Sequence, residues 1–372
     1  MQKRQAEPSS EAHSVQTAIC ASDYRGGCGY RGAVPGSGNQ GVVGTPLVIA
    51  HRGASGYRPE HTASAYRLAL ALGADAVEPD LVASRDGVLV IRHENEISGT
   101  TDVAAHPEFA ARRTTREVDG RAVTGWFTED FTWAELATLR ARERLPALRQ
   151  HSTRFDGIER MLRLEDLLQL LEAHAESTGR YVGLVAEVKH ATHFAAAGLP
   201  LDELVAAAVA AVPAEALVVE SFERTVLDRI RDRGAAGRRV YLLEDEGAPP
   251  DLVARHGSAA ASYAAQLAPD ALPVLAGDLD GISVPKSLVL ESRHGVRRSS
   301  GLVERAVAAG LAVFTWTLRA ENRFLFREHR IGSAKGDHGD WRREFSLLLG
   351  TGVSGVFADQ PDLALAARDG MG

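Results

Sequence analysis

Eight short apolar segments alternate along the chain with stretches that have the spacing of amphipathic helices. They lie near residues 47, 77, 184, 218, 241, 282, 313 and 356. Strands that are almost wholly apolar and alternate with helices indicate a parallel sheet covered on both faces. Eight such units predict a closed (β/α)8 barrel, which a chain of 372 residues can accommodate. An open doubly wound sheet is the alternative.

Local signals define the first units of this barrel. Residues 62–72 are predicted to form a helix, with Thr62 as its N-cap and Gly73 directly after its end. Asp86-Gly87 lies between apolar runs and predicts a hairpin turn. From about residue 94 to 160, Gly, Thr and charged residues predominate. We interpret this stretch as an insertion after the second strand, within one barrel that spans residues 46–372.

The first 45 residues are rich in Gly, Ser and polar residues, so we expect a disordered leader. Its cysteines, Cys20 and Cys28, could pair in an oxidising compartment, but two cysteines make no disulfide framework. The leader lacks the apolar core of a secretory signal, and no apolar run reaches the ~18 residues of a membrane span. We therefore expect no stable membrane anchor and a cytoplasmic location by default, with export as the alternative.

Polar side chains end several of the predicted strands: His51 and Arg52, Glu78 and Asp80, Glu187 and Lys189, and Trp316. Function in such barrels belongs to the carboxyl ends of the strands, and residues two apart on a strand point the same way. Three carboxylates meeting at one mouth would repel one another unless a cation lay between them. Oxygen ligands favour Mg²⁺ or Ca²⁺ over zinc. A rim salt bridge is the simpler interpretation for either carboxylate of the second strand taken alone, but a metal site better explains all three.

Two histidines near the ends of the first predicted strands have the chemistry that phosphodiester cleavage needs. His51 and His93 can act as the base that activates an attacking hydroxyl and the acid that protonates the leaving oxygen. Arg52 and Lys189 can neutralise charge on the phosphoryl oxygens. Trp316 belongs either to the core or to an aromatic wall for the substrate. The net charge of -7 argues against a general nucleic-acid binder.

The same motifs resemble those of a known family of enzymes. They are His51-Arg52-Gly53, Pro59-Glu60-His61-Thr62, Glu78-Pro79-Asp80, Asp86-Gly87, His93, Glu187-Val188-Lys189, Phe314–Thr317 and Val356–Asp359. In this order and spacing they resemble the glycerophosphodiester phosphodiesterase family. The resemblance implies a TIM barrel with a divalent cation, Ca²⁺ or Mg²⁺. It also implies hydrolysis of a small-molecule glycerophosphodiester to sn-glycerol 3-phosphate and an alcohol.

The resemblance also implies roles for individual residues. By position, the metal ligands would be Glu78, Asp80 and Glu187, the acid–base pair His51 and His93, and the phosphate contacts Arg52 and Lys189. Glu60 would orient the first loop or contact the metal or glycerol. The neighbouring glycerol hydroxyl would attack phosphorus first, giving a cyclic phosphate that water then opens. The insertion would correspond to a cap over the site.

The sequence departs from the family pattern at three places. His61 stands where the family usually has Asn, Glu94 stands where an Asp often follows the second histidine, and the insertion is long. Two other functions stay open. One is a barrel phosphodiesterase that acts on intact phospholipid, although no basic amphipathic helix marks a membrane-docking face. The other is a catalytically silent barrel that binds a phosphate ligand.

Overall fold

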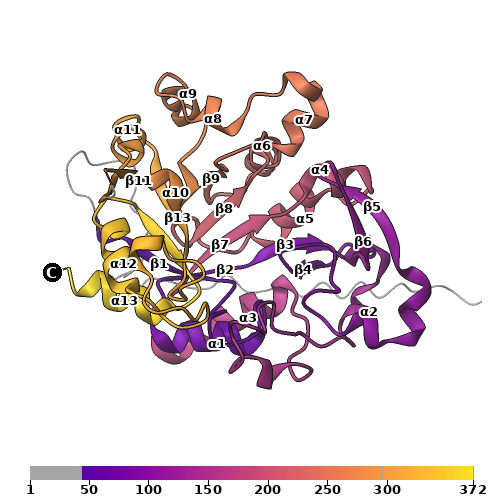
Figure 1. Cartoon of the computed structure of the whole chain (residues 1–372). Helices are drawn as coiled ribbons and strands as arrows, with labels where there is room; N and C mark the ends of the chain where they lie inside the picture. The colour runs from indigo at the N-terminus through magenta and orange to yellow at the C-terminus, as the bar shows by residue number, and fades with distance from the viewer. Residues whose placement is uncertain (1–43, 295, 372) are drawn as a thin grey trace, which may run out of the picture.

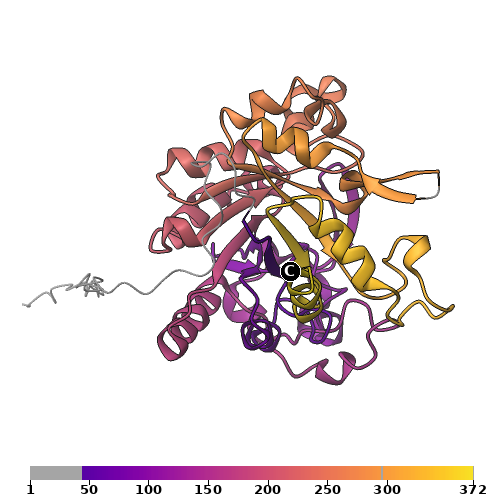
Figure 2. The same cartoon turned by 90° about the vertical axis from the view of Figure 1, so that its left-hand side faces the viewer.

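The computed structural model describes residues 44–294 and 296–371 (Figures 1 and 2). The predicted leader, with the pairing of Cys20 and Cys28, therefore lies outside the described residues, except for residues 44 and 45. Within the described ranges, no helix combines the length and the apolar character that crossing a bilayer would require.

Eight parallel strands close into a barrel, as the sequence predicts. Their order around the sheet is β2-β1-β14-β13-β10-β9-β8-β7, and β7 closes the ring by pairing with β2. The strands are β1 (Leu47–His51), β2 (Ala76–Glu78), β7 (Gly183–Val188), β8 (Leu217–Ser221), β9 (Arg238–Leu242), β10 (Gly281–Pro285), β13 (Ala312–Leu318) and β14 (Gly355–Ala358).

Helices surround the barrel and complete the predicted architecture (Figure 2). The first confirms the expected boundaries: Thr62 Oγ1 accepts the Ala65 N–H at 3.2 Å, and Gly73 ends the helix at φ 92°. The helices are α1 (Ala63–Leu72), α2 (Trp133–Leu136), α3 (Leu164–Thr178), α4 (Ala191–Ala196), α5 (Leu201–Ala208), α6 (Arg224–Asp232), α7 (Pro250–His256), α8 (Tyr263–Gln266), α9 (Leu272–Ala276), α10 (Lys286–Val289), α11 (Leu302–Ala308), α12 (Trp341–Leu349) and α13 (Pro361–Asp369).

The second barrel strand is interrupted at Pro79. Proline has no N–H to donate to a ladder, so β2 ends at Glu78 and β3 (Asp80–Ala83) begins after it. The Pro79 carbonyl still accepts the Glu187 N–H at 3.0 Å, which keeps both pieces beside β7. The predicted hairpin is confirmed, since β3 pairs antiparallel with β4 (Leu89–Ile91) around Asp86-Gly87.

The segment between β4 and α3 adds no strand to the barrel in the described residues. It holds the antiparallel hairpin β5 (Thr114–Val118) and β6 (Arg121–Gly125) together with α2 and short 3-10 turns. Helix α2 of this segment is a single turn that begins at Trp133 and ends at Leu136. In Figure 1 this segment lies at the end of the barrel away from the C-terminus. A second hairpin, β11 (Leu290–Arg293) and β12 (Val296–Ser299), projects from the helical ring (Figure 2).

Alternate residues of each strand face two different apolar layers. Along β1, Leu47 and Ile49 pack in a small cluster inside the barrel with Val185, Phe314 and others. Val48 and Ala50 belong instead to the large layer between strands and helices. A period of two then places the next inward side chain of β1 at His51, on the carboxyl end of the barrel.

Candidate active site

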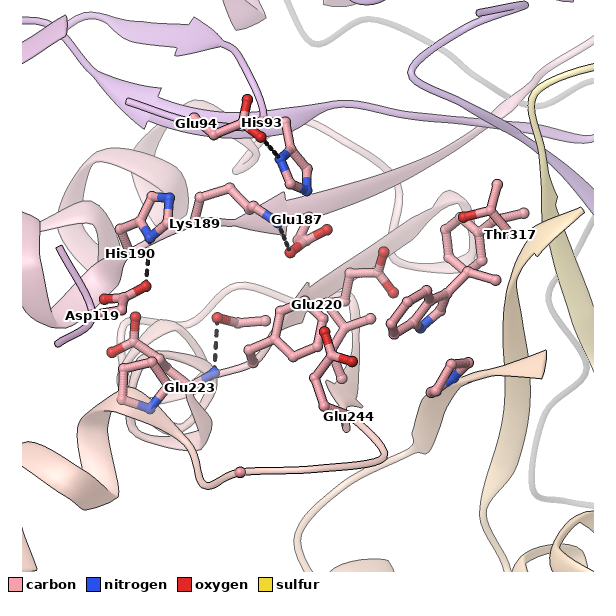
Figure 3. Close-up of a pocket in the computed structure, with 18 of the residues that line it drawn as sticks. His93, Glu94, Asp119, Glu187, Lys189, His190, Glu220, Glu223, Glu244 and Thr317 are labelled. Carbon is pink, nitrogen blue, oxygen red and sulfur yellow. Dashed lines mark hydrogen bonds and ion pairs between the residues drawn. The ribbon is translucent and has the colours of Figure 1, made fainter. Parts of the chain in front are cut away.

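The inward positions at the carboxyl ends of the strands carry polar and aromatic side chains. On six strands, the side chain two positions after the innermost apolar residue is polar or aromatic. These side chains are His51, Glu78, Glu187, Glu220, Trp316 and Asp359. All of these except Asp359 line a cavity of about 930 Å³. In Figure 3, Glu187, Lys189 and Glu220 face this cavity from neighbouring strands. The barrel mouth is therefore the candidate site.

The three carboxylates predicted as metal ligands come together. Glu78, Asp80 and Glu187 each offer one oxygen, and these oxygens lie within 4.8 Å of one another. The pairing of β3 with β7 sets Asp80 directly beside Glu187. All three residues are buried, and neither Glu78 Oε1 nor Asp80 Oδ1 has a hydrogen-bond partner among the described residues. Orphaned carboxylate oxygens gathered out of water fit a hard divalent cation.

The electrostatics of the three carboxylates lead to the same conclusion. Burial and the neighbouring charge of Asp80 raise the pKa of Glu78 well above its ordinary value. Burial likewise raises the pKa of Glu187 to about 8, although Lys189 opposes the shift. The pKa of Asp80 is held well below its ordinary value despite burial, because Lys189 and other cationic groups lie close. Without a further cation, only part of the group is ionised at neutral pH.

The two predicted phosphate contacts lie beside this carboxylate triad. Lys189 Nζ is 2.7 Å from Glu187 Oε1 and 3.6 Å from Asp80 Oδ1. Arg52, at φ 60°, donates its backbone N–H to Glu78 Oε2 at 2.8 Å. Its guanidinium reaches Glu60 at 3.1 Å and Asp80 at 3.2 Å. Both cations are thus fixed at the rim of the triad, where an anion could meet them.

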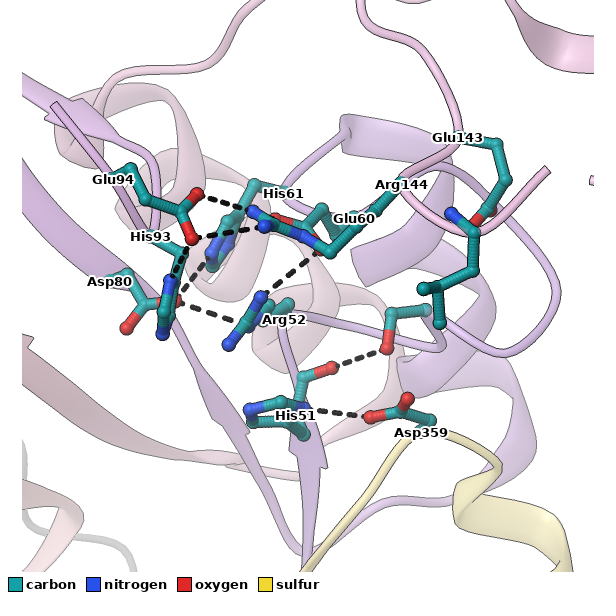
Figure 4. A network of polar contacts seen from close by, with 12 residues as sticks. His51, Arg52, Glu60, His61, Asp80, His93, Glu94, Glu143, Arg144 and Asp359 are labelled. Atoms are coloured by element: carbon teal, nitrogen blue, oxygen red, sulfur yellow. Dashed lines mark hydrogen bonds and ion pairs between the residues drawn. The ribbon is translucent and has the colours of Figure 1, made fainter. Parts of the chain in front are cut away.

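Each predicted acid–base histidine is held by a carboxylate (Figure 4). His51 Nδ1 lies 2.7 Å from Asp359 Oδ1, and His93 Nδ1 lies 2.6 Å from Glu94 Oε1. Among the described residues, the Nε2 atom of neither ring has a hydrogen-bond partner. Burial and the charge of Arg52 lower the pKa of His51 to about 4 and that of His93 to about 3. Both rings are therefore neutral near pH 7, with the unprotonated Nε2 free for proton transfer.

His61, a departure from the family pattern, takes a defined place behind the triad. Its ring is fully buried, with Nε2 2.8 Å from Asp80 Oδ2 and Nδ1 2.8 Å from the Tyr66 hydroxyl. Burial lowers the pKa of His61, so a neutral ring donates Nε2–H to the Asp80 carboxylate. It fixes one oxygen of Asp80 and leaves Oδ1 for a cation.

Glu60 and Trp316, the other two residues predicted to contact the substrate, differ in their surroundings. Glu60 accepts hydrogen bonds from Arg52 at 3.1 Å and from Arg144 at 2.6 Å, so it links the first loop to Arg144. It does not belong to the group of converging carboxylates among the described residues. Trp316 lines the cavity and packs edge-on against Phe222, with ring centroids 6.0 Å apart. Trp316 also packs against the inner apolar cluster of the barrel, so both of its predicted positions stay open.

Sequence reasoning missed several residues of the site. Glu220 is buried and lies directly beside Glu187 in the pairing of β7 with β8. One of its carboxylate oxygens has no hydrogen-bond partner among the described residues. Asp359 orients His51. Both could have been found by extending the inward period of two by one step on the fourth and eighth strands. Arg144 carried no such signal, because it lies in an irregular segment.

Three comparisons with known proteins concern the same region. A family model described as the glycerophosphoryl diester phosphodiesterase family matches residues 51–363. The chain is 41% identical over 145 residues to a glycerophosphodiester phosphodiesterase of Arabidopsis thaliana, covering 39% of this chain and 37% of that protein. It is 34% identical over 151 residues to a glycerophosphodiester phosphodiesterase of Haemophilus influenzae, and this match covers 38% of this chain and 39% of that protein. The matched chain thus spans less than half the length of these relatives.

A solved structure supports the fold independently. A phosphodiesterase of Oleispira antarctica, determined in complex with the product sn-glycerol-3-phosphate, superposes with a TM-score of 0.54 at 23% sequence identity. The match covers 87% of this chain and 97% of that chain. The barrel architecture is therefore shared over almost the whole described chain.

Proposed function

The chain belongs to the glycerophosphoryl diester phosphodiesterase family, and from this premise we propose that it hydrolyses glycerophosphodiesters to sn-glycerol 3-phosphate and an alcohol. One observation carries the proposal. Three buried carboxylates converge beside two cationic side chains, and two histidines that line the same cavity are each held by a carboxylate. The bound product of the Oleispira relative supports the same substrate class.

The carboxylate triad would hold a divalent cation, Ca²⁺ or Mg²⁺, through Glu78, Asp80 and Glu187. When bound, such a cation supplies positive charge that stabilises the phosphoryl oxygens as negative charge builds on them. The orphaned oxygens of Glu78 and Asp80 support this assignment. Arg52 and Lys189 would bind the remaining phosphoryl oxygens and fix the diester in the mouth.

The histidines would move the protons. In the first stage, Nε2 of one ring takes the proton of the glycerol hydroxyl that attacks phosphorus. Nε2 of the other ring gives a proton to the leaving alcohol oxygen as its bond to phosphorus breaks. Burial and the charges of Arg52 and Lys189 depress the pKa of His93, and the bound phosphate offsets those two charges, so this ring can be protonated in the complex. Water then opens the cyclic phosphate with the roles reversed.

Product identification tests this function directly. Purified protein is incubated with glycerophosphocholine and Ca²⁺ or Mg²⁺, and products are identified by ³¹P NMR and a coupled sn-glycerol 3-phosphate assay. We expect sn-glycerol 3-phosphate and choline. Release of phosphocholine would contradict the bond assignment, and calorimetric binding without turnover would indicate a silent phosphate-binding barrel. Turnover of intact phospholipid vesicles alone would favour the lipid-directed alternative.

A further inference from the structure

Two arginines of the segment between β4 and α3 reach back to the barrel mouth. Arg144 and Arg149 are five positions apart in the irregular stretch that follows α2. The Arg144 side chain is 29% exposed and that of Arg149 only 4%. Neither belongs to the carboxylate triad, and neither lines the cavity.

Arg144 joins the first loop to the carboxylate behind His93 (Figure 4). Its Nε and Nη2 donate to the two oxygens of Glu60, both at 2.6 Å. Its Nη1 and Nη2 donate to the two oxygens of Glu94, at 2.9 and 2.6 Å. One planar guanidinium thus holds two carboxylates that would otherwise repel each other, and Glu94 in turn holds Nδ1 of His93.

Arg149 occupies the matching place behind His51. Its Nη2 donates to Asp359 Oδ2 at 2.6 Å, while the other oxygen of Asp359 holds the histidine ring. The remaining donors of Arg149 reach Glu321 at 2.6 Å and the Ser55 carbonyl at 3.0 Å. This guanidinium therefore ties the last barrel strand to the loop after the first.

The geometry suits arginine and no other side chain. Bridging two carboxylates, or a carboxylate and a carbonyl, requires several donors in one rigid plane. A lysine at either position would keep the charge but could not keep every contact. The insertion therefore does more than cover the mouth, because it delivers a fixed cation behind each histidine-holding carboxylate.

We propose that Arg144 and Arg149 are positioning residues for the hydrolysis. Arg144 acts on His93 and Arg149 acts on His51, each through the carboxylate that lies between them. This inference rests on the proposed function. Removing Arg144 takes away the only arginine that holds Glu94 among the described residues, so this carboxylate is free to turn and the His93 ring loses its productive orientation. Removing Arg149 leaves Asp359 held by Arg319 alone, at 2.7 Å, so the loss of orientation at His51 should be smaller. We expect each arginine to contribute to kcat about as much as other residues that orient a catalytic side chain.

The test compares Arg144→Ala and Arg144→Lys with the control Arg142→Ala. Arg142 belongs to the same stretch, but its side chain is exposed and has no hydrogen bond or ion pair among the described residues. We expect Arg144→Ala to lower kcat for glycerophosphocholine roughly 10- to 100-fold. Millimolar guanidinium should restore part of the rate, Arg144→Lys should fall in between, and Arg142→Ala should match wild type.

A double variant separates positioning from simple loss of stability. If Arg144 acts through Glu94, Arg144→Ala combined with Glu94→Gln should cost much less than the product of the two single effects. Thermal melts report the folded fraction, and Arg149→Lys provides a charge-preserving test of the second arm, with kcat expected to fall several-fold. Arg144→Ala with wild-type kcat, or a loss that follows only the folded fraction and that guanidinium does not restore, would overturn the inference. An inactive wild-type protein would instead overturn the proposed function, and this inference with it.

Discussion

His51 shows how one side chain acquires a chemical role from its surroundings. Asp359 holds Nδ1, burial keeps the ring neutral, and Nε2 is left facing the cavity. The carboxylate triad does not depend on this ring, because its hydrogen-bond partners are Arg52, His61 and Lys189. A substitution at His51 should therefore impair proton transfer without weakening cation binding.

Replacing His51 by alanine should abolish proton transfer and spare the cation site. We expect His51→Ala to lower kcat roughly 10²- to 10⁴-fold, the usual contribution of a general acid or base. Calorimetry should give a Ca²⁺ affinity close to that of wild type. His256→Ala, at an exposed histidine, is the matched control and should change neither quantity. Wild-type turnover by His51→Ala would refute the acid–base assignment.

The pKa of Glu187 predicts how cation affinity depends on pH. In the metal-free protein this carboxyl holds its proton up to about pH 8, whereas in the unfolded chain it loses the proton near pH 4.5. A cation must displace that proton and also the proton of Glu78, whose pKa is raised too, so affinity should rise with pH by roughly tenfold per unit or more below pH 8. Calorimetry at pH 6.5 and 8.5 measures the change. An affinity independent of pH would mean that neither Glu78 nor Glu187 is a ligand.

At the residue level, the sequence predicted the groups that lie on regular strands. Glu78, Asp80 and Glu187 follow from a strand period of two and a common carboxyl edge. Arg144 and Arg149 do not, because no periodicity relates an irregular segment to the loop that it contacts. Asp359 could have been predicted as a site residue, since it directly follows the eighth strand.

The loop between β1 and α1 explains the glycine of the His-Arg-Gly motif. Gly53 has φ 82°, and a Cβ there would lie 2.8 Å from the backbone carbon of Ala65 in the first turn of α1. The backbone can pass the helix at this point only without a side chain. This close passage fixes Arg52 against the triad.

A methyl group at Gly53 should therefore disturb both stability and the site. We expect Gly53→Ala to lower the free energy of unfolding by about 2–4 kcal/mol, from left-handed backbone strain and overpacking together. Gly99→Ala is the control, because Gly99 lies outside the left-handed region and a Cβ there would meet nothing within 4 Å. Urea denaturation measures both. Equal stability of the two variants would contradict this account of the loop.

At the level of elements, apolar segments gave the positions of all eight barrel strands. The missing N–H of Pro79 is typical of a strand end, and β2 does end at Glu78, but the chain continues beside β7 as β3 on the far side of the proline. For the irregular segment between β4 and α3, only the approximate limits could be predicted from the sequence. Its contacts are salt bridges made by long side chains, such as Arg144 with Glu60 and Glu94, and these leave no pattern in the sequence.

Barrel closure brings together residues from opposite ends of the chain. Pairing of β1 with β14 sets Ala50 beside Ala358, so that His51 meets Asp359 across 308 positions of sequence. The same closure places two cations, Arg52 and Lys189, at the mouth of a protein whose net charge is -7, and we propose that they bind an anionic substrate there. Overall charge therefore says little about the ligand of this barrel.

The central claim is that three carboxylates share one divalent cation that the hydrolysis requires. The most direct measurement is the rate of sn-glycerol 3-phosphate release from glycerophosphocholine by chelator-treated protein, before and after Ca²⁺ or Mg²⁺ is added. We predict a negligible rate before addition, recovery afterwards, and no recovery for Glu78→Gln. A full rate in excess chelator, or wild-type recovery by Glu78→Gln, would contradict the claim.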